Sequence, residues 1–91
     1  MKYDVDGNLD AGFVDKFRAE IESLAEAQED VVLNLSRVSF MDSRGIGALV
    51  ALHRKLVAKG LRLKVKGLRG QPLQIFISLE LITLFCGSGN Q

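Results

Sequence analysis

The sequence predicts a small α/β domain, and three features of the middle of the chain support this fold class. Residues 31–35 form a continuous apolar run, which is typical of a strand buried on both faces. From Ile46 to about Lys59 the apolar residues recur with the spacing of one helical face. From Leu61 to Lys66 apolar and basic residues alternate, as in a strand with one wet face. Such a strand, helix and strand predict a crossover that joins two parallel neighbouring strands.

Length and composition indicate a single domain that covers residues 1–91. The chain is 47% hydrophobic and 25% charged, which is ordinary for a soluble globular protein. Cys86 is the only cysteine, so no internal disulfide is possible and no cysteine pair offers a metal site. We also expect no cofactor. The N-terminal residues lack the pattern of a signal peptide, and no apolar run is long enough to insert into a bilayer. We therefore expect a cytoplasmic protein.

The charges are unevenly distributed along the chain. Residues 1–30 hold nine acidic and three basic side chains, whereas residues 31–91 hold nine basic and two acidic ones. Such asymmetry can indicate contact with nucleic acid or a membrane. The basic residues do not cluster with aromatic ones, as they do in proteins that bind single strands. We therefore interpret the two regions as oppositely charged faces of one domain and expect no nucleic-acid partner.

The flanking segments predict an edge strand and two further helices. Lys2–Asp6 alternates as a short edge strand does, and Asp10 suits the N-cap of a helix that runs to about residue 28. Pro72 is well placed in the first turn of a third helix. Three predictions concern the C-terminus: residues 82–85 continue this helix or form a last short strand, Cys86 packs in the interior, and residues 87–91 form a flexible tail.

The junction between the central strand and its helix is the candidate site. Asp42 and Ser43 place a carboxylate and a hydroxyl at a helix N-terminus, after a strand of an α/β sheet, where such proteins commonly bind ligands. Either residue could simply cap the helix. A catalytic pair with His53 fails, because ten helical residues separate it from Ser43 by about 15 Å. We therefore expect no enzyme activity and a packing role for His53.

At this point the residues resemble a known family. Residues 31–52 are similar to the signature of STAS domains, the bacterial anti-sigma-factor antagonists and their relatives: an apolar strand, Asn-Leu-Ser, and an Asp-Ser turn before a Gly-x-Gly helix start. Residues 7–10 match the family's Gly-x-Leu-Asp, and Pro72–Phe85 resembles its C-terminal segment. The resemblance implies a STAS fold, a mixed β-sheet of about four strands covered on one side by α-helices.

The resemblance also implies a function, that of a non-enzymatic regulatory protein. In the antagonists, the serine at the position of Ser43 is phosphorylated by a partner serine kinase, an anti-sigma factor with the fold of histidine-kinase-like ATPases, and a phosphatase resets it. A docking surface of Asp42, Ser43, Arg44, Gly45 and Gly47 follows, with the glycines keeping the helix start slim. The alternative is a constitutive STAS subunit of a membrane lipid-transport ATPase complex.

Three features depart from the family pattern. Arg44 replaces the usual second Ser or Thr, so a cation stands beside the expected phosphoacceptor and can pair with a phosphate. Glu80 stands where the family usually has Gly, which predicts a longer third helix. The N-terminus is short, and the family's first strand is missing or very weak.

Overall fold

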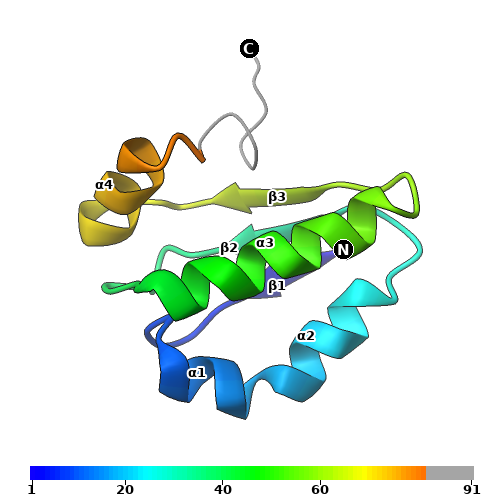
Figure 1. Ribbon diagram of the computed structural model, residues 1–91, viewed down its shortest axis with the longest axis horizontal. Helices are drawn as coiled ribbons and strands as arrows, with labels where there is room; N and C mark the ends of the chain where they lie inside the picture. The colour runs from blue at the N-terminus through cyan, green and yellow to red at the C-terminus, as the bar shows by residue number, and fades with distance from the viewer. Residues whose placement is uncertain (82–91) are drawn as a thin grey trace.

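The computed structural model describes residues 1–81, which fold into strands and helices that alternate along most of the chain (Figure 1). In order these are β1 (Lys2–Asp4), α1 (Ala11–Lys16), α2 (Arg18–Ala25), β2 (Val31–Asn34), α3 (Ser43–Val57), β3 (Leu63–Lys66) and α4 (Gly70–Ser78). The predictions for residues 82–85, Cys86 and residues 87–91 lie outside the described residues.

The described strands form one parallel sheet in the order β1-β2-β3. Val32 pairs with Lys2 on one side and with Lys64 on the other. The predicted crossover from β2 through α3 to β3 is therefore confirmed, and so is the edge strand at the start of the chain. A fourth strand, which would be needed for a mixed sheet, would fall on residues 82–85 and stays a prediction.

The helices cover one face of this sheet. Val31, Leu33, Leu63 and Val65 are buried beneath them, and α3 crosses in front of the sheet in Figure 1. The opposite face carries the half-buried Val32 and Asn34 and the exposed side chains of Lys64 and Lys66. The prediction that β2 is buried on both faces is thus wrong for the described part of the chain, because α1, α2 and α3 lie on the side of Leu33, whereas Val32 and Asn34 are only half-buried.

The first predicted helix is divided at Phe17. The α1 helix ends at Lys16 and α2 begins at Arg18, whereas the apolar periodicity runs through the division without a break. The Phe17 ring stacks on Phe13, with the ring centres 4.0 Å apart, and meets the edge of Tyr3 at 6.2 Å. The division therefore coincides with an aromatic cluster that joins the helix to the edge strand β1.

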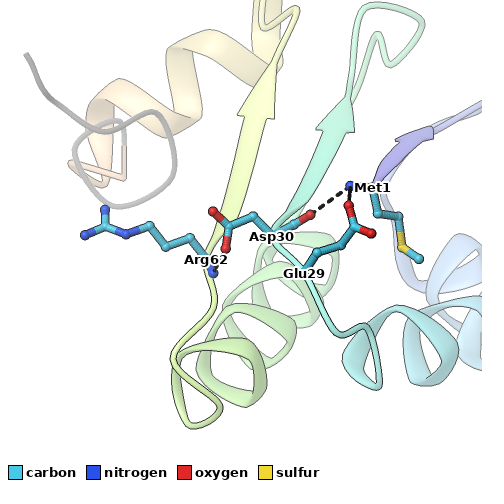
Figure 2. Close-up of polar contacts among 4 residues, drawn as sticks. All are labelled: Met1, Glu29, Asp30 and Arg62. Atoms are coloured by element: carbon cyan, nitrogen blue, oxygen red, sulfur yellow. Dashed lines mark hydrogen bonds and ion pairs between the residues drawn. The ribbon is translucent and has the colours of Figure 1, made fainter.

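The starts of the strands are joined by polar contacts (Figure 2). The Met1 ammonium group donates to the Glu29 carboxylate at 2.8 Å and to the Asp30 carbonyl oxygen at 3.0 Å. The Asp30 carboxylate in turn accepts a hydrogen bond from the Arg62 backbone N–H at 2.9 Å. These contacts are exposed, so each contributes little to the stability of the fold, and their main effect is to align the strands.

Two helices end in the same hydrogen-bonded turn. After α3, Gly60 N–H donates to the Val57 carbonyl and Leu61 N–H to the Leu56 carbonyl, with Gly60 at φ +80°. After α4, Glu80 takes the corresponding position at φ 57° and donates to Ile77. The prediction that Glu80 lengthens this helix is wrong, because α4 ends at Ser78. Glu80 instead adopts the left-handed conformation that glycine adopts without strain.

Candidate functional site

The segment that leads into α3 is held by the loop that leads into α1. Leu9 N–H donates to the Phe40 carbonyl, and Asp42 N–H donates to the Leu9 carbonyl, both at 3.0 Å. Leu9 itself is buried in the core, as is Met41, with which it forms an isolated parallel bridge. The Gly-x-Leu-Asp segment therefore does more than begin a helix. It fixes the backbone immediately before Ser43.

Asp42 is the N-cap of α3. Its backbone is extended, and its Oδ1 atom accepts hydrogen bonds from the backbone N–H groups of Arg44, at 2.9 Å, and Gly45, at 3.1 Å. Ser43 is the first helical residue and its side chain is exposed. Within residues 1–81 the Ser43 hydroxyl makes no hydrogen bond. The geometry thus assigns capping to Asp42 and leaves the serine hydroxyl available to solvent.

The two glycines at the start of α3 differ in their surroundings. Gly45 is buried, and a Cβ atom there would overlap the Leu9 carbonyl oxygen and lie 2.7 Å from the Leu9 Cβ. Gly47 is exposed, and a Cβ atom there would have nothing within 4 Å. Of the two glycines, only Gly47 is open at the surface, and a part for Gly45 in partner binding stays a prediction. Gly45 lets the helix approach Leu9, whereas Gly47 lies open at the surface.

Gln71, a residue that the sequence analysis missed, fastens α4 to this junction. Its side-chain Nε2 donates to the Met41 carbonyl and its Oε1 accepts from the Met41 N–H, both at 2.8 Å. The side chain thus pairs with the Met41 backbone as a neighbouring strand would. No local pattern marks a glutamine for this role, because its partner lies thirty residues earlier.

The Asn-Leu-Ser segment of the motif also has a structural role. Asn34 Oδ1 accepts from the Ser36 N–H at 3.1 Å, and Asn34 Nδ2 donates to the Asp4 carboxylate at 3.1 Å. The Arg69 guanidinium donates to the Ser36 carbonyl oxygen through Nη2 at 2.8 Å. Gly67, at φ +79°, leaves the space that Asn34 and Ser36 occupy. These contacts hold the loops after β1, β2 and β3 together on the side of the sheet where α3 begins.

An open groove of about 580 Å³ runs between α3 and α4, with Ser43 at one end. One face of α3 lines it with residues three or four positions apart, and α4 and its C-cap residue contribute one apolar side chain each. The lining residues are Ser43, Ile46, Gly47, Val50, Ala51, Arg54, Lys55, Ile75 and Leu79. The candidate site is therefore a surface that continues from the exposed serine along the helix, which is more suited to docking than to enclosing a small substrate.

His53 lies on α3 ten residues beyond Ser43 and is half-buried. Burial, and secondly the positive charge of Arg62, lower the pKa of its imidazole. A neutral imidazole fits the packing role that the sequence predicted. Among residues 1–81, no group of three or more His, Cys, Asp or Glu side chains could hold a metal ion. No helix in this part of the chain is long and apolar enough to cross a membrane.

Comparison with known proteins identifies the family. The STAS domain model matches residues 1–86, so the chain belongs to the STAS domain family. A sulfate transporter family protein from Wolinella succinogenes has a similar structure, with a TM-score of 0.73 and 20% identity over 89% of this chain. This chain spans 66% of that one, just under two thirds. The fold of the anti-sigma factor antagonist SpoIIAA in its unphosphorylated form is also similar, with a TM-score of 0.70 and 22% identity over 98% of this chain and 79% of SpoIIAA. No curated protein sequence gives a significant match.

Proposed function

We propose that the protein is a non-enzymatic regulatory module of the anti-sigma-factor-antagonist type, whose binding to a protein partner is switched by phosphorylation of Ser43. The observation that carries the proposal is the division of roles at the start of α3. Asp42 caps the helix, so the exposed Ser43 hydroxyl is not needed to hold the fold. Membership of the STAS family and the similarity to SpoIIAA support the same function.

A phosphate on Ser43 would act on the surface and leave the fold in place. It would stand at a helix N-terminus, where the helix dipole favours negative charge. Asp42 already accepts the N–H groups of Arg44 and Gly45, so the phosphate would add its charge of about −2 beside an existing carboxylate. The Arg44 side chain, which is exposed, is the nearest cation in the sequence that could pair with it. The net result is a strongly negative patch that repels an acidic partner.

The partner that this mechanism requires is a serine kinase of the anti-sigma type, with the fold of histidine-kinase-like ATPases, and a cognate phosphatase that resets the switch. The surface proposed to bind it contains Asp42, Ser43, Arg44 and Gly47, with Gly45 supporting it from beneath. We propose that the protein acts in the cytoplasm and binds neither a metal nor a cofactor itself; the phosphoryl group on Ser43 would come from ATP bound to the partner kinase.

The test compares Ser43→Ala, Ser43→Asp and the control Ser23→Asp as immobilised baits in a lysate of the protein's own cells. Ser23 is an exposed serine on α2, so the control adds the same charge on another helix. We expect the wild type, Ser43→Ala and Ser23→Asp to retain the same partner, and Ser43→Asp to lose it. Equal retention by Ser43→Ala and Ser43→Asp would count against the switch.

A second candidate function is a constitutive subunit of a membrane transport complex, such as a lipid-transport ATPase. The similarity to a sulfate transporter family protein favours this class, although at 20% identity that likeness concerns the fold alone. In this case Ser43 would need no modification. Co-purification with a membrane ATPase, unchanged by Ser43→Ala and Ser43→Asp, would distinguish it from the first candidate.

A further inference from the structure

We infer that the groove between α3 and α4 binds an amphipathic helix of the partner protein, with small apolar residues facing the groove and acidic residues flanking them. The inference rests on the proposed function and names the partner surface that this function requires. The groove begins at Ser43, so one surface would serve both for binding and for regulation.

The walls of the groove are apolar and held in place. Ile75 on α4 and Leu79, the residue that caps its C-terminus, line the groove, and the Leu79 side chain is 53% exposed. The same helix is anchored on its other side by the buried Pro72 and Phe76. Its first turn is fastened by the two Gln71 hydrogen bonds to the backbone before α3.

Small side chains recur along the face of α3 that lines the groove, so the helix backbone lies close to the groove surface. Ser43, Gly47 and Ala51 are spaced by four positions, which places them on one helical face. Gly47 destabilises a helix interior relative to alanine, and nothing in residues 1–81 lies close enough to require it. A glycine at this position would instead allow the backbone of a partner protein to approach α3 closely. Docking of a helix in an apolar groove is a recurrent mode of peptide recognition.

The charge of the groove selects an acidic occupant. Arg54 and Lys55 line it, and no Asp or Glu is among its lining residues within the described chain. The chain's own acidic helix α2 does not provide the occupant from a second copy, because its apolar residues Ile21 and Leu24 already pack in its own core. The structure therefore favours another protein, whose acidic flanks pair with Arg54 and Lys55.

The position of Ser43 explains how phosphorylation would regulate this docking. The serine lines the groove at the start of α3, while Arg54 and Lys55 lie about three turns further along the same helix. An acidic helix along the groove would therefore extend to the phosphate. Repulsion between the phosphate and the acidic flank would weaken binding without any movement of the fold.

The experiment uses two designed helical peptides of about 14 residues, or four turns. Both carry the same face of alanine, valine and leucine, flanked by Glu in one peptide and by Lys in the other. NMR chemical shifts of the full chain map the site, and fluorescence anisotropy gives the dissociation constants. We expect the acidic peptide to change the amide chemical shifts of Gly47 and Ile75. It should also bind about tenfold more tightly than the basic peptide, because its charges complement those of Arg54 and Lys55.

Matched variants test shape and charge separately. Lys55→Glu should weaken binding of the acidic peptide about tenfold, whereas Lys64→Glu, the same change of charge on β3, should leave it unchanged. Gly47→Gln should place a side chain in the groove and weaken binding of the acidic peptide. Gly12→Gln on α1, also at an exposed helical glycine, should leave binding unchanged. Unchanged shifts at Gly47 and Ile75, or equal affinities for Lys55→Glu and Lys64→Glu, would overturn the inference.

The same proteins separate this inference from the proposed function. If Ser43 carries phosphate in cells and its variants control partner retention, but neither peptide binds, the inference about the groove fails and the proposed function stands. If the acidic peptide binds Ser43→Ala and Ser43→Asp equally, the groove is supported and the regulatory switch is contradicted.

Discussion

Gly45→Ala and Gly47→Ala form a pair of substitutions, two residues apart on one helix, for which the structure predicts opposite effects on stability. At Gly45 the new Cβ atom would lie 2.7 Å from the Leu9 Cβ and 2.8 Å from the Leu9 carbonyl carbon, where ordinary contacts begin at 3.4 Å. Part of the obstruction is backbone, so no side-chain rotation relieves it. The start of α3 must therefore move away from Leu9.

The magnitude follows from three contributions. Overpacking of this kind costs about 1–3 kcal/mol, and weakening the hydrogen bond between Asp42 N–H and the Leu9 carbonyl adds about 1 kcal/mol. The higher helix propensity of alanine stabilises the folded state by about 1 kcal/mol and so offsets part of this loss. We expect Gly45→Ala to lower the free energy of unfolding by about 1–3 kcal/mol. Gly47→Ala, which gains propensity without a contact, should raise it by about 0.5–1 kcal/mol.

Urea unfolding followed by far-ultraviolet circular dichroism measures both changes, since the chain has no tryptophan. Each kcal/mol should shift the melting temperature by about 4–8 °C in a domain of this size. If Gly45→Ala is as stable as the wild type, or if both variants are destabilised to the same extent, the packing of α3 on Leu9 described above is incorrect.

Two further predictions concern Glu80 and His53. Glu80→Gly should raise the free energy of unfolding by about 0.5–1 kcal/mol, because glycine adopts the left-handed conformation after α4 without strain; a loss of stability in thermal unfolding would contradict this. The folded-state pKa of His53 is lowered, so below the unfolded value of about 6.5 the unfolded chain binds more protons and stability falls as pH decreases. His53 is the only histidine, so His53→Gln should flatten the change in unfolding free energy between pH 7.5 and 5.5 in urea titrations. An unaltered slope would show that another group is responsible.

The features that the sequence predicted correctly are those with a local cause. An apolar strand, a polar turn before a helix and the periodicity of that helix all depend on residues within a few positions of one another. The crossover between β2 and β3 and the start of α3 at Ser43 were therefore predictable. The sequence left open whether Asp42 or Ser43 caps this helix, and the assignment of the cap to Asp42 required coordinates.

The features that the sequence did not reveal depend on contacts between distant segments. Gly45 looks like a surface glycine until Leu9, thirty-six residues earlier, is found against it. Gln71 shows no pattern that connects it to Met41. The division of the first helix at Phe17 accompanies ring contacts with Phe13 and Tyr3, which periodicity alone does not predict. The groove beside Ser43 likewise depends on where α4 packs.

The intact mass of the protein isolated from its own cells, with the modified site mapped by peptide sequencing, tests the central claim most directly. The account predicts a fraction of molecules that are heavier by one phosphate, located on Ser43, and that vary with growth conditions. Unmodified Ser43 under all conditions would contradict the regulatory switch. It would favour instead a constitutive subunit in which Asp42 caps the helix and Ser43 is an unmodified surface residue.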